Sequence, residues 1–182
     1  MPMYHNGNRE LQGLFGSTAL ADRLEQRLRH SEFTEDDKAF IESLEFFFLA
    51  TATPIGQPDC SFKGGPPGFA RVIAPNLLVW PDYDGNGMFK SLGNIAINPS
   101  VGLLFIRFGA SPKRLRVNGS AVISLDDPLI PDFPGAQAII RVTPIDIFPN
   151  CPRYIPDQAT AGPSPYIPHE GEPPVEPKWK TM

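Results

Sequence analysis

The chain of 182 residues has few cysteines, no excess of positive charge and no long apolar run, and each shortage excludes a class of protein. Its two cysteines, Cys60 and Cys151, form no CxxC pair and have no histidine at ligand spacing, so we expect neither a disulfide framework nor a metal site. A formal net charge of -4 leaves no broad basic surface for a phosphate backbone, so we expect no nucleic-acid partner. The longest apolar run, residues 46–50, is far shorter than the roughly 20 residues of a membrane helix.

The first residues also lack the basic and then apolar pattern of a signal peptide, so we expect a cytoplasmic protein with no membrane partner. The length fits one domain with extensions. Changes in composition divide the chain into an N-terminal helical extension (residues 1–44), a β domain (residues 45–148) and a proline-rich tail (residues 149–182).

The tail holds nine prolines, which disfavour helix and central strand and favour an extended chain. One interpretation is a disordered segment, which such a composition favours. The other is an ordered tail that docks on a surface, of this chain or of a partner subunit, through apolar side chains at intervals. These side chains are Tyr154, Ile155, Tyr166, Ile167 and Trp179.

Two helices are expected before the β domain. Residues 18–30 carry Leu20, Leu24 and Leu28 four positions apart with charged residues between them, which is the pattern of an amphipathic helix. Thr34 precedes three acids and is placed as the N-cap of a second helix that ends near Ser43.

From residue 45 the sequence changes to short runs of high β propensity between glycines and prolines. The runs are residues 46–53, 61–63, 69–73, 77–80, 101–108, 115–125 and 138–148. This spacing predicts a mainly β fold, a small antiparallel barrel with flanking helices. One helical segment, about residues 86–98, interrupts the strands.

A glycine-rich turn, residues 82–89, leads into that helix, which opens with Lys90 and no acid. A helix N-terminus carries partial positive charge, so a lysine there is unfavourable unless an anion is bound. Free backbone N–H groups at the turn are suited to hold a phosphate, with the ammonium balancing its charge. The alternative is a tight turn followed by a solvated surface lysine.

Five blocks in order resemble the pyridoxamine 5'-phosphate oxidase-like flavin-binding split barrels. The most specific block contains the sequence DYDGNGMFKSLGN and continues to residue 106. The others are residues 4–24, which resemble a helical leader, 46–51, 58–72, and 114–119 together with 148–155. The resemblance implies a six- to seven-stranded antiparallel split barrel. It also implies a homodimer with FMN at the subunit interface, where residues of both chains surround each flavin.

The resemblance and the helix-end argument agree on the phosphate cradle. We expect Asn86, Lys90 and Ser91 to bind the FMN phosphate, with Gly85 and Gly87 letting the backbone approach closely. Asp82 and Tyr83 precede the cradle and are assigned to cofactor or substrate contact. A capping acid and a half-buried tyrosine explain them equally well.

Other residues are candidates for the flavin rings. Arg71, Val72 and Ile73 fall where the family's second strand runs beside the rings, although an ordinary strand with one exposed arginine is the alternative. Lys63 stands beside Gly64 and Gly65, which would allow a ligand close to the strand or would simply form a bulge or turn.

Arg114 and Arg116 alternate with apolar residues, so on a strand they share one face. That face meets the flavin, the other subunit or solvent. No catalytic residue is assigned, and Cys151 is interpreted as a small core residue rather than a nucleophile. No metal is assigned to the three isolated histidines.

These interpretations lead to two functions. In the first, the protein is an FMN-dependent oxidoreductase that moves hydride between a nicotinamide or small organic substrate and the flavin. In the second, it is a non-catalytic protein that binds or sequesters a flavin, a deazaflavin or haem on the same barrel. A purely structural role predicts a colourless protein that FMN does not stabilise.

Overall fold

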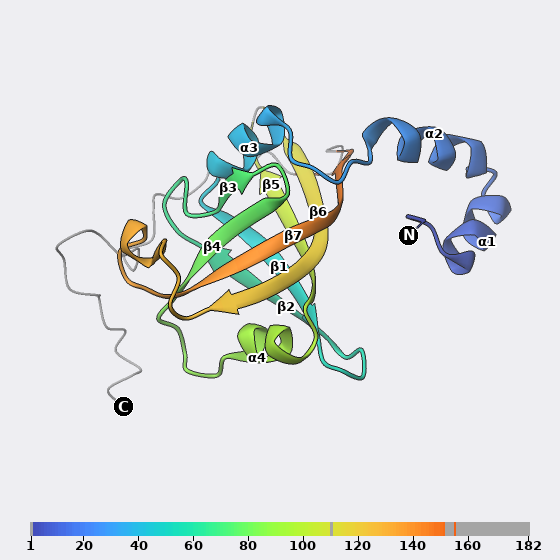
Figure 1. The fold of residues 1–182 in the computed structure, drawn as a ribbon. Helices are drawn as coiled ribbons and strands as arrows, with labels where there is room; N and C mark the ends of the chain where they lie inside the picture. Colours follow the sequence, from blue (N-terminus) through green and yellow to red (C-terminus); the bar gives the residue numbers. More distant parts are fainter. Residues whose placement is uncertain (1, 110, 152–154, 156–182) are drawn as a thin grey trace.

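The computed structural model describes residues 2–109, 111–151 and 155, and seven antiparallel strands there form one curved sheet (Figure 1). The strands are β1 (Phe46–Ala52), β2 (Pro58–Gly64), β3 (Arg71–Ala74), β4 (Leu77–Tyr83), β5 (Ser100–Arg107), β6 (Lys113–Ser124) and β7 (Ala136–Asn150). Their order is β2-β1-β5-β6-β7-β4-β3, so β2 and β3 are the edges. The predicted mainly β fold is confirmed, and the ends of the predicted strands shift by at most three residues.

The hydrophobic core fills the inside of the curved sheet. Strand β5 illustrates the alternation: its buried Val101, Leu103 and Phe105 face the core, and the residues between them face outward. Phe47 lies at the centre, with its ring centroid 5.2 Å from that of Trp80 and 5.1 Å from that of Phe105. Because successive residues of a strand face opposite ways, the neighbours of Phe47 lie on the outside.

Outside the sheet, Phe46, Phe48, Phe62 and Phe108 form an outer aromatic cluster over β1, β2 and the end of β5. Phe46 stacks on Phe62 at 5.3 Å and on Phe108 at 6.1 Å between ring centroids. Phe62 remains 62% exposed. The outer face of this half of the sheet is therefore apolar and open.

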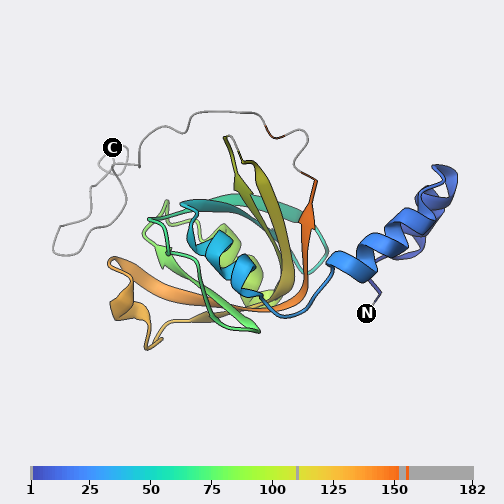
Figure 2. The same ribbon diagram turned by 90° about the horizontal axis from the view of Figure 1, so that it is seen from above.

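Two helices close the ends of the barrel (Figures 1 and 2). Helix α3 (Glu35–Glu42) begins where predicted, because Thr34 forms a capping box with Asp37, and it buries Phe40 and Ile41. Helix α4 (Lys90–Ile97) lies at the other end against β1, β2 and β6. A short 3₁₀ helix, η1 (Ile130–Asp132), precedes β7. Among the described residues, no helix is long and apolar enough to span a bilayer.

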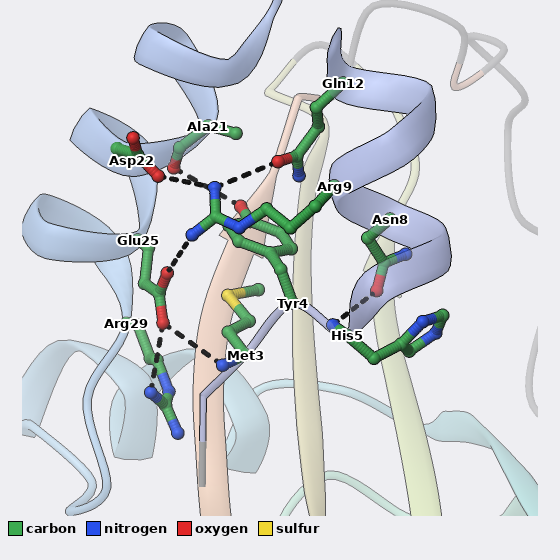
Figure 3. A network of polar contacts seen from close by, with 10 residues as sticks. All are labelled: Met3, Tyr4, His5, Asn8, Arg9, Gln12, Ala21, Asp22, Glu25 and Arg29. Carbon is green, nitrogen blue, oxygen red and sulfur yellow. Dashed lines mark hydrogen bonds and ion pairs between the residues drawn. The ribbon is translucent and has the colours of Figure 1, made fainter.

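Helices α1 (Asn6–Leu14) and α2 (Thr18–Leu28) form a hairpin that projects to one side of the barrel (Figures 1 and 2). Helix α2 confirms the amphipathic pattern, whereas α1 was expected only from the resemblance. Within the hairpin, Arg9 pairs with Asp22 at 2.5 Å and with Glu25 at 3.8 Å (Figure 3). Arg29 joins it to the barrel through Asp146 at 2.5 Å.

Strand β7 extends two residues beyond the predicted start of the tail. Pro149 was expected to exclude a strand, but it pairs with Leu115 of β6. Pairing with β4 ends at Val142, so the later part of β7 has a continuous neighbour on one side only, where a missing N–H is tolerated. Pro144 lies at the bulge opposite Gly119. Residues 152–154 and 156–182 of the predicted tail lie outside the described residues.

Candidate functional site

A pocket of about 380 Å³ lies at the N-terminus of α4. One wall is formed by residues 59–63 of the edge strand β2, and the other by residues 82–92, which contain the end of β4, the glycine-rich turn and the start of α4. The structure brings together six predicted site residues here. They are Lys63, Asp82, Tyr83, Asn86, Lys90 and Ser91.

The start of α4 has no side-chain cap and no acid in its first turn. Phe89 at the N-cap has left-handed backbone angles, φ 47° and ψ 31°. Lys90 and Ser91, the first two residues of the helix, both line the pocket. The N–H groups of a first helical turn lack intrahelical partners, so this helix end offers hydrogen-bond donors and positive potential to the pocket.

Hydrogen bonds hold this helix end in place. The hydroxyls of Ser61 on β2 and Ser91 on α4 are 2.9 Å apart, which joins the two walls of the pocket. One turn later, buried Asn94 donates to the Thr51 hydroxyl of β1 at 2.9 Å. In the turn itself, the Met88 N–H donates to the Asn86 side-chain oxygen at 3.0 Å, so Asn86 shapes the loop.

Charge in the pocket is shaped by partial burial. Burial lowers the pKa of Lys63, and the negative charges of Asp82 and Asp59 oppose that shift. Burial likewise raises the pKa of Asp82, opposed by Lys63 and reinforced by Asp84. Burial also raises the pKa of Tyr83, and the nearby charge of Arg71 opposes it. Burial thus makes the charged forms of Lys63 and Asp82 less stable than they are in water, without deciding which form each side chain holds.

The two lysines of the pocket form no ion pair within 4.0 Å with any described residue. The ion pairs of the described chain are made elsewhere, by Arg9, Arg29, His30 and Arg141. Lys63 and Lys90 therefore keep positive charge for an incoming group, next to the uncapped start of α4. Together with the Ser61 and Ser91 hydroxyls, they form a donor set that fits a phosphate or another small anion.

The structure does not bring Arg71, Val72 and Ile73 to this pocket. They lie on β3, the edge strand that pairs with β4, and they do not line the pocket, although the charge of Arg71 is close enough to affect the pKa of Tyr83. The Arg71 guanidinium lies 4.1 Å from the ring centroid of Phe133 and donates to the Gly68 carbonyl at 2.7 Å. The Val72 N–H donates to Glu42 at 3.1 Å, so these residues have structural partners of their own.

Arg114 and Arg116 also lie away from the pocket. As predicted they share one face of β6, where Arg114 donates to the Cys151 carbonyl and Arg116 is exposed. That face continues the outer side of the sheet, because Arg116 pairs with Leu104 of β5. Cys151 is exposed rather than part of the core, which corrects the interpretation made from its residue type.

Lys63 was identified from the sequence, but the residues of β2 that precede it in the pocket wall were not. Asp59, Ser61 and Lys63 alternate along the strand, so they share the face that forms the pocket wall. This alternation was readable, but the contact of the strand with α4 was not. Among the described residues, no group of three or more His, Cys, Asp or Glu side chains is placed to hold a metal ion.

Comparisons with known proteins agree with this fold. No curated protein matches the sequence. A candidate pyridoxamine 5'-phosphate oxidase from Lactobacillus delbrueckii has a TM-score of 0.53 at 20% identity, covering 65% of this chain and 95% of that chain. An FMN-binding protein from Syntrophomonas wolfei has a TM-score of 0.50 at 12% identity, covering 78% of this chain and 97% of that chain. HupZ of Group A Streptococcus has a TM-score of 0.50 at 18% identity, covering 64% and 93%.

At these identities the solved structures establish the likeness of the fold. The sequence comparison goes further, because the model of the pyridoxamine 5'-phosphate oxidase family matches residues 33–149. That match begins after the α1–α2 hairpin, runs through all seven strands and covers more than half of the chain. The chain therefore belongs to the pyridoxamine 5'-phosphate oxidase family.

Proposed function

We propose that this protein is a flavoprotein that binds FMN with its phosphate at the start of α4. The observation that carries the proposal is the uncapped N-terminus of α4 between two lysines that have no ion-pair partner among the described residues. A phosphate there would accept hydrogen bonds from backbone N–H groups and from Ser91 and would be balanced by Lys90. The similar protein from S. wolfei is an FMN-binding protein, which supports this choice of cofactor.

We propose further that the activity is that of an oxidoreductase acting on a nicotinamide or small organic substrate. Bound FMN would supply the hydride chemistry. The protein would then need to position the substrate and polarise the flavin, and it would need no nucleophile of its own. Lys63 and Asp82 lie in the same pocket with pKa values shifted toward their uncharged forms. Side chains with shifted pKa values in a pocket are candidates to hold or release a proton beside the reacting centre.

The proposed assembly is a homodimer in which FMN lies at the subunit interface. Support comes from the open apolar outer face of β1 and β2, which borders the pocket through Phe62. Covering this face with a second copy would remove exposed aromatic surface from water. Arg114 and Arg116 lie on the continuation of the same face, so they would act across the interface and not within one chain.

The phosphate site is tested by Lys90→Glu. Reversing this charge places a carboxylate beside the phosphate, and we expect the dissociation constant for FMN to rise at least about 30-fold, equivalent to about 2 kcal/mol. Binding of riboflavin, which lacks the phosphate, should change by less than threefold. The matched control is Arg27→Glu, the same charge change at an exposed position of α2. Equal FMN affinity of Lys90→Glu and Arg27→Glu would remove the cradle assignment.

Catalysis is tested by anaerobic mixing of the FMN-loaded protein with NADH or NADPH while the oxidised flavin band is followed. Bleaching by either donor supports the oxidoreductase. A flavin that neither donor reduces indicates a binding or sequestering protein, and a Soret band in the purified protein would indicate haem instead. FMN at 100 times its dissociation constant should also stabilise the fold by about 2.7 kcal/mol, and an unchanged melting curve would contradict FMN binding.

A further inference from the structure

A second pocket, of about 720 Å³, lies between the projecting hairpin and the barrel. The hairpin contributes Tyr4, Leu24 and Leu28, and the outer face of the sheet contributes Arg116 and Phe148. Its hairpin wall lies before residue 33, where the family match begins, so the pocket is built partly from a segment outside that match. We call it the hairpin pocket.

The hairpin pocket is apolar on one side and open. Leu24 and Leu28 point along one side of α2 and remain 43% and 37% exposed. The hairpin itself buries little, because Ala21 is its single buried residue among those described in α1 and α2. Its links to the barrel are polar: the ion pair of Arg29 with Asp146, and the backbone bridge of His30 with Ile147. An apolar occupant would therefore complete the packing between hairpin and barrel.

The course of the chain points to an occupant. Strand β7 ends at Asn150, and Cys151, which follows it, lines the hairpin pocket. Beyond Ile155, which is half-buried, 27 residues follow to the end of the sequence. Tyr166 comes 11 residues after Ile155, a length that spans up to about 35 Å when extended. The tail thus leaves the barrel at the rim of the pocket and is long enough to return to it.

We propose that the C-terminal segment of this same chain, residues 156–182, docks in the hairpin pocket with Tyr166 and Ile167 as its anchors. These two apolar residues are adjacent, between Pro165 and Pro168. Flanking prolines favour an extended conformation and lower the entropy cost of docking. Grooves lined by aromatic side chains are the usual receptors for such segments, and Tyr4 and Phe148 supply aromatic walls here.

Charge is also complementary. Glu170 and Glu172 follow the anchors by a few residues. Arg116 at the pocket is exposed and makes no ion pair with the described residues. Because the segment is tethered beside its site, its effective concentration is in the millimolar range, so weak contacts are enough to keep it docked. The docked tail fastens the hairpin to the barrel.

The test uses the full chain with a photo-crosslinking p-benzoylphenylalanine in place of Tyr166. After irradiation of a mixture of isotopically heavy and unlabelled chains, mass spectrometry maps the partners. We expect crosslinks to peptides of α2 or of residues 146–151, within one chain. Leu24→Asp in the pocket wall should lower the yield at least fivefold. Leu20→Asp, on α2 but not lining the pocket, should change it by less than twofold.

Hydrogen exchange gives an independent readout on the protein without the crosslinker. Replacing Tyr166 and Ile167 by serine in the full chain should speed amide exchange in α1 and α2 at least threefold, with little change in β5. Unchanged exchange in the hairpin would overturn the proposal. So would crosslinks to other surfaces or mainly between heavy and unlabelled chains, the latter assigning the site to a second copy.

Discussion

Phe89 has the strained backbone of the candidate site. It is the one non-glycine residue with positive φ among the described residues, and it stands directly before the first turn of α4. A left-handed conformation costs an ordinary L-residue about 1 kcal/mol or more. The side chain is 58% exposed, so packing recovers little of that cost. The strained residue lies in the turn that directs the uncapped N-terminus of α4 toward the pocket.

Phe89→Gly should raise the free energy of unfolding by about 0.5 to 1 kcal/mol, because glycine adopts this conformation without strain. Urea unfolding at equilibrium measures the change. Met88→Gly is the matched control: Met88 is also exposed but has negative φ, so glycine there should lower stability. A loss of stability in both variants would show that φ at residue 89 is not a source of strain.

Among the described residues, Asp127 is the carboxyl with the most strongly shifted pKa, and it does not line the candidate pocket. It accepts two hydrogen bonds from Arg141, at 2.6 and 2.9 Å, and one from the Leu129 N–H at 3.0 Å. The bond to Arg141 is the main cause that lowers the pKa of Asp127 to about 2. Since this pKa lies below the unfolded value, the charged form stabilises the fold.

We expect Asp127→Asn to lower the free energy of unfolding by about 2 kcal/mol at pH 7. The stabilising contribution is fully present above the unfolded pKa of 3.8 and is lost as the pH falls toward the folded pKa of about 2. The difference between variant and wild type should therefore shrink between pH 4 and pH 2. Urea unfolding across that range measures it, and a difference independent of pH would contradict the ion-pair explanation.

At the scale of elements, the pairing of β6 with β7 depends on one glycine. The register shifts between Asn118 and Gly119, and Pro144 lies opposite. A Cβ at Gly119 would overlap the Thr143 carbonyl oxygen and lie 3.0 Å from a methyl group of Val142. The bulge therefore needs glycine for close approach of the backbones.

Gly119→Ala should destabilise the protein by about 2 kcal/mol or more, because the overlap is with backbone and cannot be relieved by a rotamer change. Gly102→Ala on β5 is the comparison, since its Cβ would meet its nearest atom at 3.5 Å, an ordinary contact. Thermal unfolding of both variants measures the difference. Equal melting temperatures would show that the bulge adjusts.

The elements with strong local signals were predictable. Thr34 before a run of acids located the start of α3, and the leucine spacing located α2. Helix α1 was expected only from the resemblance. The end of β7 was predicted too early, because Pro149 was taken to exclude a strand. The later part of β7 pairs mainly on one side, which is a property of the sheet and not of the local sequence.

The candidate site was predictable where it is contiguous in sequence. The turn and the start of α4 lie within residues 82–92, so local chemistry was enough to find them. The second wall comes from β2, whose Ser61 meets Ser91 across 30 positions. The place of Arg71 on an edge strand beside β4 was not readable from the sequence, because strand order is set by tertiary packing; its assignment to the flavin stays a prediction.

At the scale of the whole molecule, the hairpin and the barrel have separate packing. The main core cluster begins at Phe33 and includes no residue of α1 or α2. Polar contacts and one backbone bridge carry most of the junction. The barrel should therefore fold without the hairpin.

Removal of residues 1–28 should lower the melting temperature by no more than about 4 °C and change FMN affinity less than threefold. Differential scanning calorimetry and FMN titration measure the two effects. The truncation retains the ion pair of Arg29 with Asp146 and removes that of Arg29 with Glu25. A truncated chain that aggregates or fails to bind FMN would show that the hairpin belongs to the folding unit.

Strand β2 forms both a wall of the candidate site and an edge of the sheet. An edge strand offers unpaired backbone groups to any passing chain, and a half-buried charged side chain on it is a means by which proteins prevent strand-to-strand association. Lys63 is such a side chain, because it is half-buried on this edge strand. One side chain therefore combines two properties: Lys63 contributes positive charge to the candidate site, and its charge on the edge strand disfavours pairing with the strand of another chain.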